Sequence, residues 1–438
     1  MPESIRGFVM EHPLFDAHEH VSSVPDYAKQ EPHFTALLSY ATADLVTARG
    51  PVGVGERVLP AVDDPGYTSA FFELWRRSRA TGYCRATERA CRDLLGLEFR
   101  EENADAITEA YAKFVGDDPR ASYCMVLQEK AGVAWGIKDS IQTPEATSDE
   151  LYPEFIRFNY RDDGLLCILS RDDVGQREAW WHRSIHSLDD LVDGLMQSIS
   201  DCLATGKVTS FKIGVAYRRG LDFKDPTKHE AERAFNRLMS VDVDATVQAT
   251  SAAGLPSRQS RLSAEELRPL QDYITQRYIR RAADENLPIQ VHTGYLAGNA
   301  GVLNNINPMQ LVPTLMRYPR VRFDLFHAGW PYQHEMGTIG KNFPNTWLNL
   351  CWAWTMNPAT MERTLDAWLD GVPHCKIFGL GSDTHSPLMV YGYAVQAREG
   401  IARVLQRKID RGDIDLTLAK EIARCIMLEN GVHFHGLG

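Results

Sequence analysis

Short apolar segments alternate with helical patterns along most of the chain, and this alternation restricts the possible folds more than any other feature. Strands that alternate with helices form parallel sheets, and eight such units are typical of a (β/α)8 barrel. The predicted fold is therefore α/β, a (β/α)8 TIM barrel. The eight predicted strands are "LFDAHEHV" (14–21), "GVAWGIKD" (132–139), "FIRFNY" (155–160), "VTSFKIGVAY" (208–217), "LPIQVHTGY" (287–295), "VRFDLFHAGW" (321–330), "TWLNLCWAW" (346–354) and "KIFGLGSDTHSP" (376–387).

Two long stretches interrupt the alternation. Residues 22–131 are too many for a loop, and their apolar residues have helical spacing, so we predict a mostly helical insertion after the first strand. A separate N-terminal domain is the less favoured alternative, because a strand precedes the stretch; we expect one barrel domain over residues 1–438. We expect this insertion to lie on the catalytic rim of the barrel, and residues 218–262 are predicted to form a long loop with a helix over the same rim. Ser263 and Glu266 then have capping-box spacing, which predicts the start of the next helix.

Composition excludes several classes of protein. The net charge of −11 argues against nucleic-acid binding, which requires a basic surface. No stretch approaches the roughly 20 apolar residues of a membrane span, and the N-terminal residues do not resemble a secretory signal. The eight cysteines are scattered, a pattern that favours free thiols in a reducing compartment. We therefore expect a cytoplasmic protein with a small-molecule partner.

Two histidines stand one residue apart in the first predicted strand. In a strand, alternate side chains share a face, so Asp16, His18 and His20 point to the same side. A metal ion explains two imidazoles aimed at one place, whereas a polar cluster without chemistry is the alternative. The His-x-His pair alone does not decide between them.

Polar residues recur at the carboxyl ends of other predicted strands, where barrel enzymes place their chemistry. Lys212, His292 and Asp383 each lie on the polar face of such a strand, whereas the alternation around His327 is less regular. Imidazoles and a carboxylate suit Zn²⁺, and also Mn²⁺ or Fe²⁺. The predicted metal ligands are His18, His20, His292 and Asp383. Asp383 is also predicted to take a proton from a metal-activated water and to deliver it to the leaving group.

The segments "FDAHEH", "VHTGY", "LFHAGWPY" and "GLGSDTHSP", in this order, resemble the amidohydrolase superfamily of metal-dependent barrel hydrolases. The segments "FKIGVAYRRGL" and "NPMQLVP" look most like its nodulin-type branch, which is related to uronate isomerases and, more distantly, to decarboxylases. The resemblance implies that His327 is the histidine of the sixth strand. It also places Lys212 where binuclear members carry a carboxylated lysine that bridges two metals.

The number of metal ions depends on Lys212. If Lys212 is carboxylated, His292 and His327 can hold a second ion; otherwise His292 serves a single ion, and His327 and Lys212 touch the substrate. One ion is favoured, because the nodulin-type and isomerase-type relatives look mononuclear. In both cases we predict catalytic roles for Asp383, His327 and Lys212.

Residues near the predicted rim are candidates for substrate binding. Tyr217 and Arg218 follow the fourth strand, and an arginine there can bind a substrate carboxylate through two hydrogen bonds. A solvated loop charge is the alternative. Trp330 and Tyr332 follow the sixth strand and either line the pocket or pack under the rim loops.

The predicted function is metal-dependent hydrolysis of an amide or related C–N bond in a small substrate that bears a carboxylate. One alternative is a non-hydrolytic isomerase of the uronate type, or a decarboxylase, on the same scaffold. A second alternative is a catalytically inactive binding or scaffold barrel. A homo-oligomer is the default expectation for such an enzyme.

Overall fold

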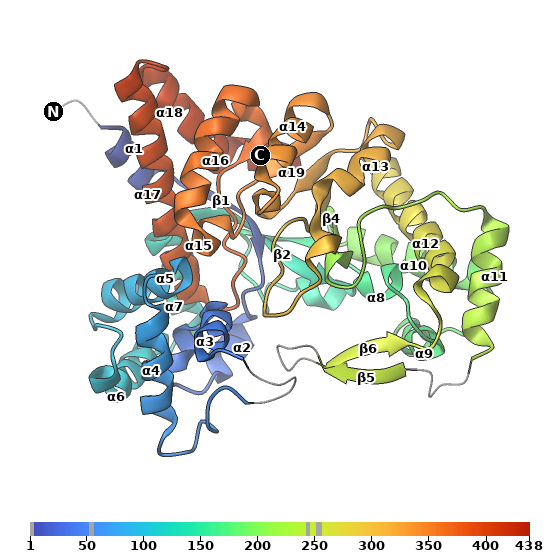
Figure 1. Cartoon of the computed structure of the whole chain (residues 1–438), viewed down its shortest axis with the longest axis horizontal. Coiled ribbons are helices and arrows are strands. Elements are labelled where there is room, and N and C mark those ends of the chain that lie inside the picture. Colours follow the sequence, from blue (N-terminus) through green and yellow to red (C-terminus); the bar gives the residue numbers. More distant parts are fainter. Residues whose placement is uncertain (1–3, 52–56, 242–245, 251–255) are drawn as a thin grey trace.

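Eight parallel strands form the centre of the molecule (Figure 1). The computed structural model describes residues 4–51, 57–241, 246–250 and 256–438. Every predicted strand coincides with an observed one. The strands are β1 (Leu14–Glu19), β2 (Val133–Ile141), β3 (Ile156–Tyr160), β4 (Val208–Ile213), β7 (Ile289–Val291), β8 (Phe323–Leu325), β9 (Thr346–Asn349) and β10 (Ile377–Phe378).

The strand order in the sheet is β1-β2-β3-β4-β7-β8-β9-β10, and all neighbours are parallel. Hydrogen bonds join the first strand to the segment after the last. The backbone N–H of Asp383 donates to the carbonyl of His18 at 2.8 Å, and the hydroxyl of Ser382 donates to Asp16 at 2.5 Å. The predicted (β/α)8 barrel is therefore confirmed.

Helices surround the barrel. Helix α12 begins directly after Ser263, whose side chain and that of Glu266 form the predicted capping box. None of the helices in the described residues is long and apolar enough to cross a membrane. The helices outside the 22–131 stretch are α1 (Ile5–Glu11), α8 (Asp163–Leu166), α9 (Arg171–Trp181), α10 (Leu188–Leu203), α11 (Lys228–Met239), α12 (Ala264–Asp284), α13 (Val312–Arg317), α14 (Gln333–Asn342), α15 (Ala353–Met356), α16 (Pro358–Gly371), α17 (Pro387–Arg411), α18 (Leu416–Arg424) and α19 (Asn430–His435).

The stretch between β1 and β2 is mostly helical and gathers beside the barrel, in blue and teal in Figure 1. Buried aromatic rings such as Phe34, Phe71 and Phe99 fill its interior, and this cluster is continuous with the barrel core. Helix α5 packs against α17. The helices are α2 (Val24–Lys29), α3 (Ala41–Arg49), α4 (Tyr67–Ser78), α5 (Gly82–Ala90), α6 (Ala104–Val115) and α7 (Pro119–Cys124).

The second long stretch differs in part from the prediction of a loop with one helix. It contains helix α11 and also an antiparallel hairpin of β5 (Thr246–Thr250) and β6 (Pro256–Ser260). The hairpin was not predicted because its sequence is short and largely polar, without the apolar alternation of a half-buried strand. Residues 242–245 and 251–255 of this stretch lie outside the described residues.

A layer of polar side chains lies inside the barrel. Asn159 and Asn349 donate hydrogen bonds to Gln290 and Asp324 at 3.1 and 3.0 Å, and Gln290 donates to Asp324 at 3.2 Å. TIM barrels usually fill this space with branched apolar residues. Burial raises the pKa of Asp324 to about 7. Because Gln290 lies on β7 two residues before His292, which follows the end of that strand, this layer forms the floor beneath the carboxyl ends of the strands.

Candidate metal centre

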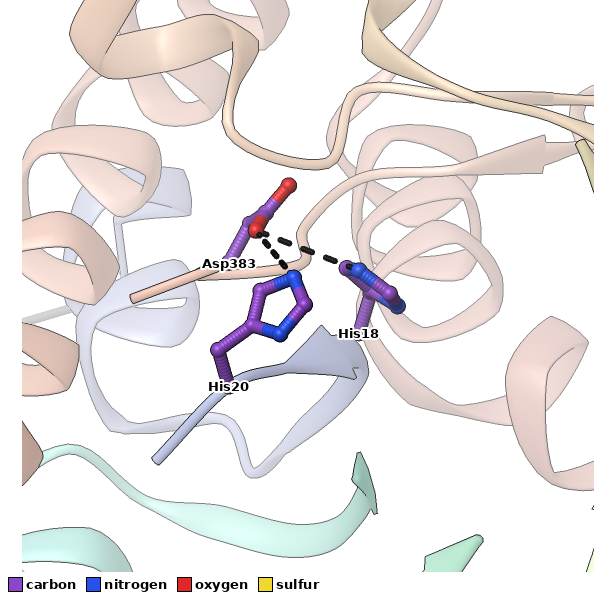
Figure 2. Close-up of side chains that lie close together, drawn as sticks. All are labelled: His18, His20 and Asp383. Carbon is purple, nitrogen blue, oxygen red and sulfur yellow. Dashed lines mark ion pairs between the residues drawn. The ribbon is translucent and has the colours of Figure 1, made fainter. Parts of the chain in front are cut away.

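His18, His20 and Asp383 converge at the junction between the first and last strands (Figure 2). One carboxylate oxygen of Asp383, Oδ1, lies 3.9 Å from Nε2 of His18 and 3.3 Å from Nε2 of His20. One ligand atom from each residue lies within 4.8 Å of the others. The positive φ of 52° at Asp383 turns the chain after β10. The structure therefore brings together three of the four predicted metal ligands.

The charges of these groups fit a divalent cation. Burial lowers the pKa of both His18 and His20 well below the ordinary value, so both imidazoles are neutral and offer lone pairs. Burial raises the pKa of Asp383 to about 7, because an ionised carboxylate there is poorly solvated. Two neutral nitrogens and one carboxylate oxygen are a ligand set that Zn²⁺ accepts, as do Mn²⁺ and Fe²⁺.

His292, the fourth predicted ligand, lies beside this group with both ring nitrogens at hydrogen-bond distance from other atoms. Its Nδ1 is 3.0 Å from Nε2 of His327, and its Nε2 is 3.0 Å from the carbonyl of Tyr295. His292 belongs to neither group of converging ligand atoms among the described residues, so its role as a ligand stays a prediction. The second such group consists of His327, Cys351 and Asp383.

His327 reaches the site because the strand ends before it. Strand β8 stops at Leu325, and a 3₁₀ turn begins at His327, where φ is 61° at His327 and 55° at Ala328. The side chain thereby leaves the alternation of the strand, which explains why it does not follow the face of Phe323 and Leu325. Its Nε2 lies 3.6 Å from Asp383. Burial lowers the pKa of His327 to about 3.

Lys212 is buried at the end of β4. Its ammonium group lies 3.4 Å from the centre of the Phe326 ring and has no hydrogen-bond partner among the described residues. Burial lowers the pKa of Lys212 to about 8. Its catalytic role and its carboxylation stay predictions.

Asp139, at the end of β2, was not predicted. Its Oδ1 lies 4.0 Å from Nδ1 of His18, and its Oδ2 lies 3.7 Å from His20 and accepts a hydrogen bond from Arg161. Burial alone would raise the pKa of Asp139, but Arg161, with the nearby histidines, holds it well below the usual range. A signal was present: Asp139 ends the predicted strand "GVAWGIKD", and the other predicted site residues also lie at the carboxyl ends of their predicted strands.

Tyr40 also contributes to the site without any signal in the sequence. It comes from the stretch after β1, and its hydroxyl donates a hydrogen bond to Oδ1 of Asp383 at 3.2 Å. Its ring lies 4.6 Å from that of Trp352, measured between ring centres. Nothing in the pattern around Tyr40 distinguishes it from a core residue of a helical segment.

A cavity of about 850 Å³ opens beside His20. Tyr217 and Arg218, both predicted to bind substrate, line it, together with Tyr40 and Arg161. The guanidinium of Arg218 is exposed and forms no ion pair with any residue in the described part of the chain. Arg161 already donates hydrogen bonds to the carboxylates of Asp139 and Asp163.

Trp330 and Tyr332 lie away from the lining of this cavity. Trp330 is half-buried and packs against Tyr295, with 5.3 Å between ring centres. Packing under the rim loops, the alternative weighed for these two side chains, agrees with this position. Their role in substrate binding stays a prediction.

Comparisons with known proteins agree with the fold. The family model described as "Amidohydrolase" matches residues 243–399. Protein fluG of Emericella nidulans is 24% identical over 245 residues, which are 55% of this chain and 27% of that protein, so the chain spans about a quarter of its length. A uronate isomerase from Thermotoga maritima has a similar structure, with a TM-score of 0.78 at 13% identity over 98% of this chain and 96% of that one. A putative metal-dependent hydrolase from Lactobacillus casei is also similar, with a TM-score of 0.67 at 16% identity over 99% and 98%.

Proposed function

We propose that the chain is a metal-dependent hydrolase. Its fold is that of the amidohydrolase superfamily, which its sequence also resembles. Its substrate is a small molecule that bears a carboxylate, and the bond cleaved is an amide or related C–N bond. The observation that carries the proposal is the convergence of His18, His20 and Asp383 beside a cavity. The nodulin-type branch, the cytoplasmic location and the homo-oligomeric state stay predictions.

We assign one divalent cation, zinc in the first place, to His18, His20 and Asp383. When bound, such a cation supplies Lewis-acid chemistry, which polarises a carbonyl group and makes a water molecule more acidic. The two oxygens of Asp383 face different groups, since Oδ1 faces His18 and His20 whereas Oδ2 lies 3.6 Å from His327. This division lets Oδ2 accept a proton from the attacking water and return it to the leaving nitrogen. Tyr40 holds Oδ1 in place through its hydrogen bond.

Arg218 supports the choice of a carboxylate-bearing substrate. A guanidinium in a cavity wall that forms no ion pair within the described part of the chain can offer two parallel hydrogen bonds to a carboxylate. Arg161 is less suited to this role, because Asp139 and Asp163 already accept hydrogen bonds from it. Tyr217 lies beside Arg218 in the wall, where its hydroxyl accepts a hydrogen bond from the backbone N–H of Ala297 at 3.2 Å.

Elemental analysis of the purified protein tests the metal centre. We expect one equivalent of metal per chain in the wild type and none in a His18→Ala/His20→Ala variant. The control is His186→Ala/His229→Ala, which removes two exposed histidines away from the site and should keep the metal. If the wild type binds no metal even after zinc or manganese is supplied, the metal centre is wrong, and the alternative of a catalytically inactive scaffold barrel is favoured.

A substrate panel tests the reaction. The loaded protein is incubated separately with a γ-glutamyl amide, a uronate and a benzoate-type acid. Release of ammonia or amine from the amide supports hydrolysis. Conversion of the uronate, or release of carbon dioxide from the acid, would replace hydrolysis by isomerisation or decarboxylation on the same scaffold.

A further inference from the structure

Three buried polar atoms around His18 have no hydrogen-bond partner among the described residues. They are Nδ1 of His18 itself, Oδ1 of Asp139 and Nζ of Lys212. A buried polar group left unpaired is destabilising, and native proteins rarely leave several together. Lys212 and His18 pack on the same ring, that of Phe326, which lies 3.4 Å from the ammonium group and 4.8 Å from the imidazole. Lys212 thus contacts the same ring as His18, and Asp139 lies within 4.0 Å of His18.

The metal centre determines which nitrogen of His18 carries the proton. Its Nε2 faces Asp383 and must keep its lone pair for the cation, so Nδ1 carries the hydrogen. The nitrogen of that N–H lies 4.0 Å from Oδ1 of Asp139. The distance is too long for a direct hydrogen bond but suits a bridge through one water molecule. A buried water typically makes about three hydrogen bonds, which is the number of unpaired atoms here.

We propose that Asp139 is a positioning residue of the metal centre: through a buried water shared with Lys212, it accepts the hydrogen bond of the His18 Nδ1–H and keeps Nε2 directed at the cation. The inference rests on the metal site of the proposed function but not on the reaction. Arg161 donates to Oδ2 of Asp139 and is itself held by Asp163, which accepts from Nε of Arg161 at 2.7 Å. This ion pair fixes the carboxylate and leaves Oδ1 for the water.

The arrangement also determines the state of Lys212. A carboxylated lysine would add a second buried anion on the side of His18 where Asp139 lies, and like charges repel. An ammonium group, in contrast, donates to the shared water and offsets the charge of Asp139. An unmodified Lys212 is thus the form that fits the shared water, and it is the form expected of a centre with one ion rather than two.

Zinc affinity of the metal-free protein, measured by competition with a chelator, tests the role of Asp139. Loss of the partner of a metal-binding histidine typically weakens metal affinity about 10- to 100-fold, and we expect this loss in Asp139→Asn. The matched control is Asp324→Asn, which changes another buried acid of the barrel that contacts Gln290 and Asn349 instead of a histidine. It should bind zinc as the wild type does.

Each outcome separates this inference from the proposed reaction. Equal affinities of Asp139→Asn and the wild type would overturn the inference. Weakened affinity in Asp139→Asn supports it even if no amide is hydrolysed, which would count against the reaction alone. A wild type that binds no zinc would overturn both the inference and the metal centre.

A second variant covers the case in which Asp139→Asn does not fold. Lys212→Met keeps an unbranched side chain, one atom shorter, that can neither be carboxylated nor donate a hydrogen bond. With bicarbonate present, we expect one zinc per chain in both the wild type and Lys212→Met. Two zinc ions in the wild type and fewer in the variant would show a carboxylated bridge and overturn the shared water.

Discussion

His435 gives the protein a stability that depends on pH. It lies in α19, is 5% exposed, and its Nδ1 is 3.2 Å from the hydroxyl of Thr209. Burial lowers the pKa of His435 from 6.5 to about 3, and the positive charge of Arg322 acts in the same direction. The ring packs against Phe15, with 5.2 Å between ring centres, and its Nε2 has no hydrogen-bond partner among the described residues. His435 is therefore neutral in the folded protein.

The sign of the effect follows from the lowered pKa. Below pH 6.5 the unfolded chain binds a proton at His435 whereas the folded chain does not, so acid favours unfolding. The stability that the neutral His435 gives the folded protein is fully present above pH 6.5 and is lost as the pH falls towards 3. Each pH unit in this range costs about 1.4 kcal/mol, which amounts to about 2 kcal/mol by pH 5.

Urea unfolding of the wild type and of His435→Gln at about pH 8 and about pH 5 measures this contribution. Glutamine keeps a polar group near Thr209 but does not titrate. The other titrating groups are common to both proteins, so their effects cancel in the difference between the two free energies of unfolding. Between about pH 8 and about pH 5, the free energy of unfolding of the wild type should fall by about 2 kcal/mol more than that of His435→Gln. The same pH dependence in both proteins would refute the assignment of a buried, neutral His435.

Arg218→Gln should raise KM for a carboxylate substrate about 10- to 100-fold and leave kcat nearly unchanged, since a hydrogen bond to a charged group contributes about 1.5–3 kcal/mol; an equal effect on an uncharged analogue would contradict carboxylate binding. Tyr40→Phe should lower kcat/KM at least about tenfold without loss of bound metal, because the carboxylate of the metal site loses a hydrogen bond. Arg177→Met should destabilise the fold by about 3–5 kcal/mol, because it leaves the buried Asp162 without its partner. The exposed ion pair of Arg237 provides the control, and Arg237→Met should cost less than about 1 kcal/mol in the same unfolding assay.

The barrel could be predicted from the sequence because its signals are local. Each strand is a short apolar run, and the helix after Ser263 begins with a cap that two residues define. The β5–β6 hairpin could not be predicted, since its strands pair with each other and their sequence is polar. Strand position also located His18, His20 and Asp383, because the carboxyl ends of parallel strands meet at one rim.

The rest of the site depends on geometry that a linear pattern does not contain. His327 enters the site through two successive residues with positive φ, which the strand alternation does not predict. Tyr40 arrives from a helical segment that folds back over the barrel. Asp139 stood at the expected end of its strand, but its neighbours showed no polar face that would have drawn attention to it.

The junction between β1 and β10 has a consequence for biosynthesis. Asp16 and Ser382, which hydrogen-bond across it, are 366 residues apart in the chain, and the proposed metal ligands His18, His20 and Asp383 come from the same two segments. During translation the first pair of ligands emerges early, but the carboxylate that completes the set follows only after nearly all of the barrel has been synthesised. A cation captured by the nascent chain is therefore held by histidines alone until late in synthesis. The complete set of proposed ligands thus forms only after the junction between β1 and β10 has formed.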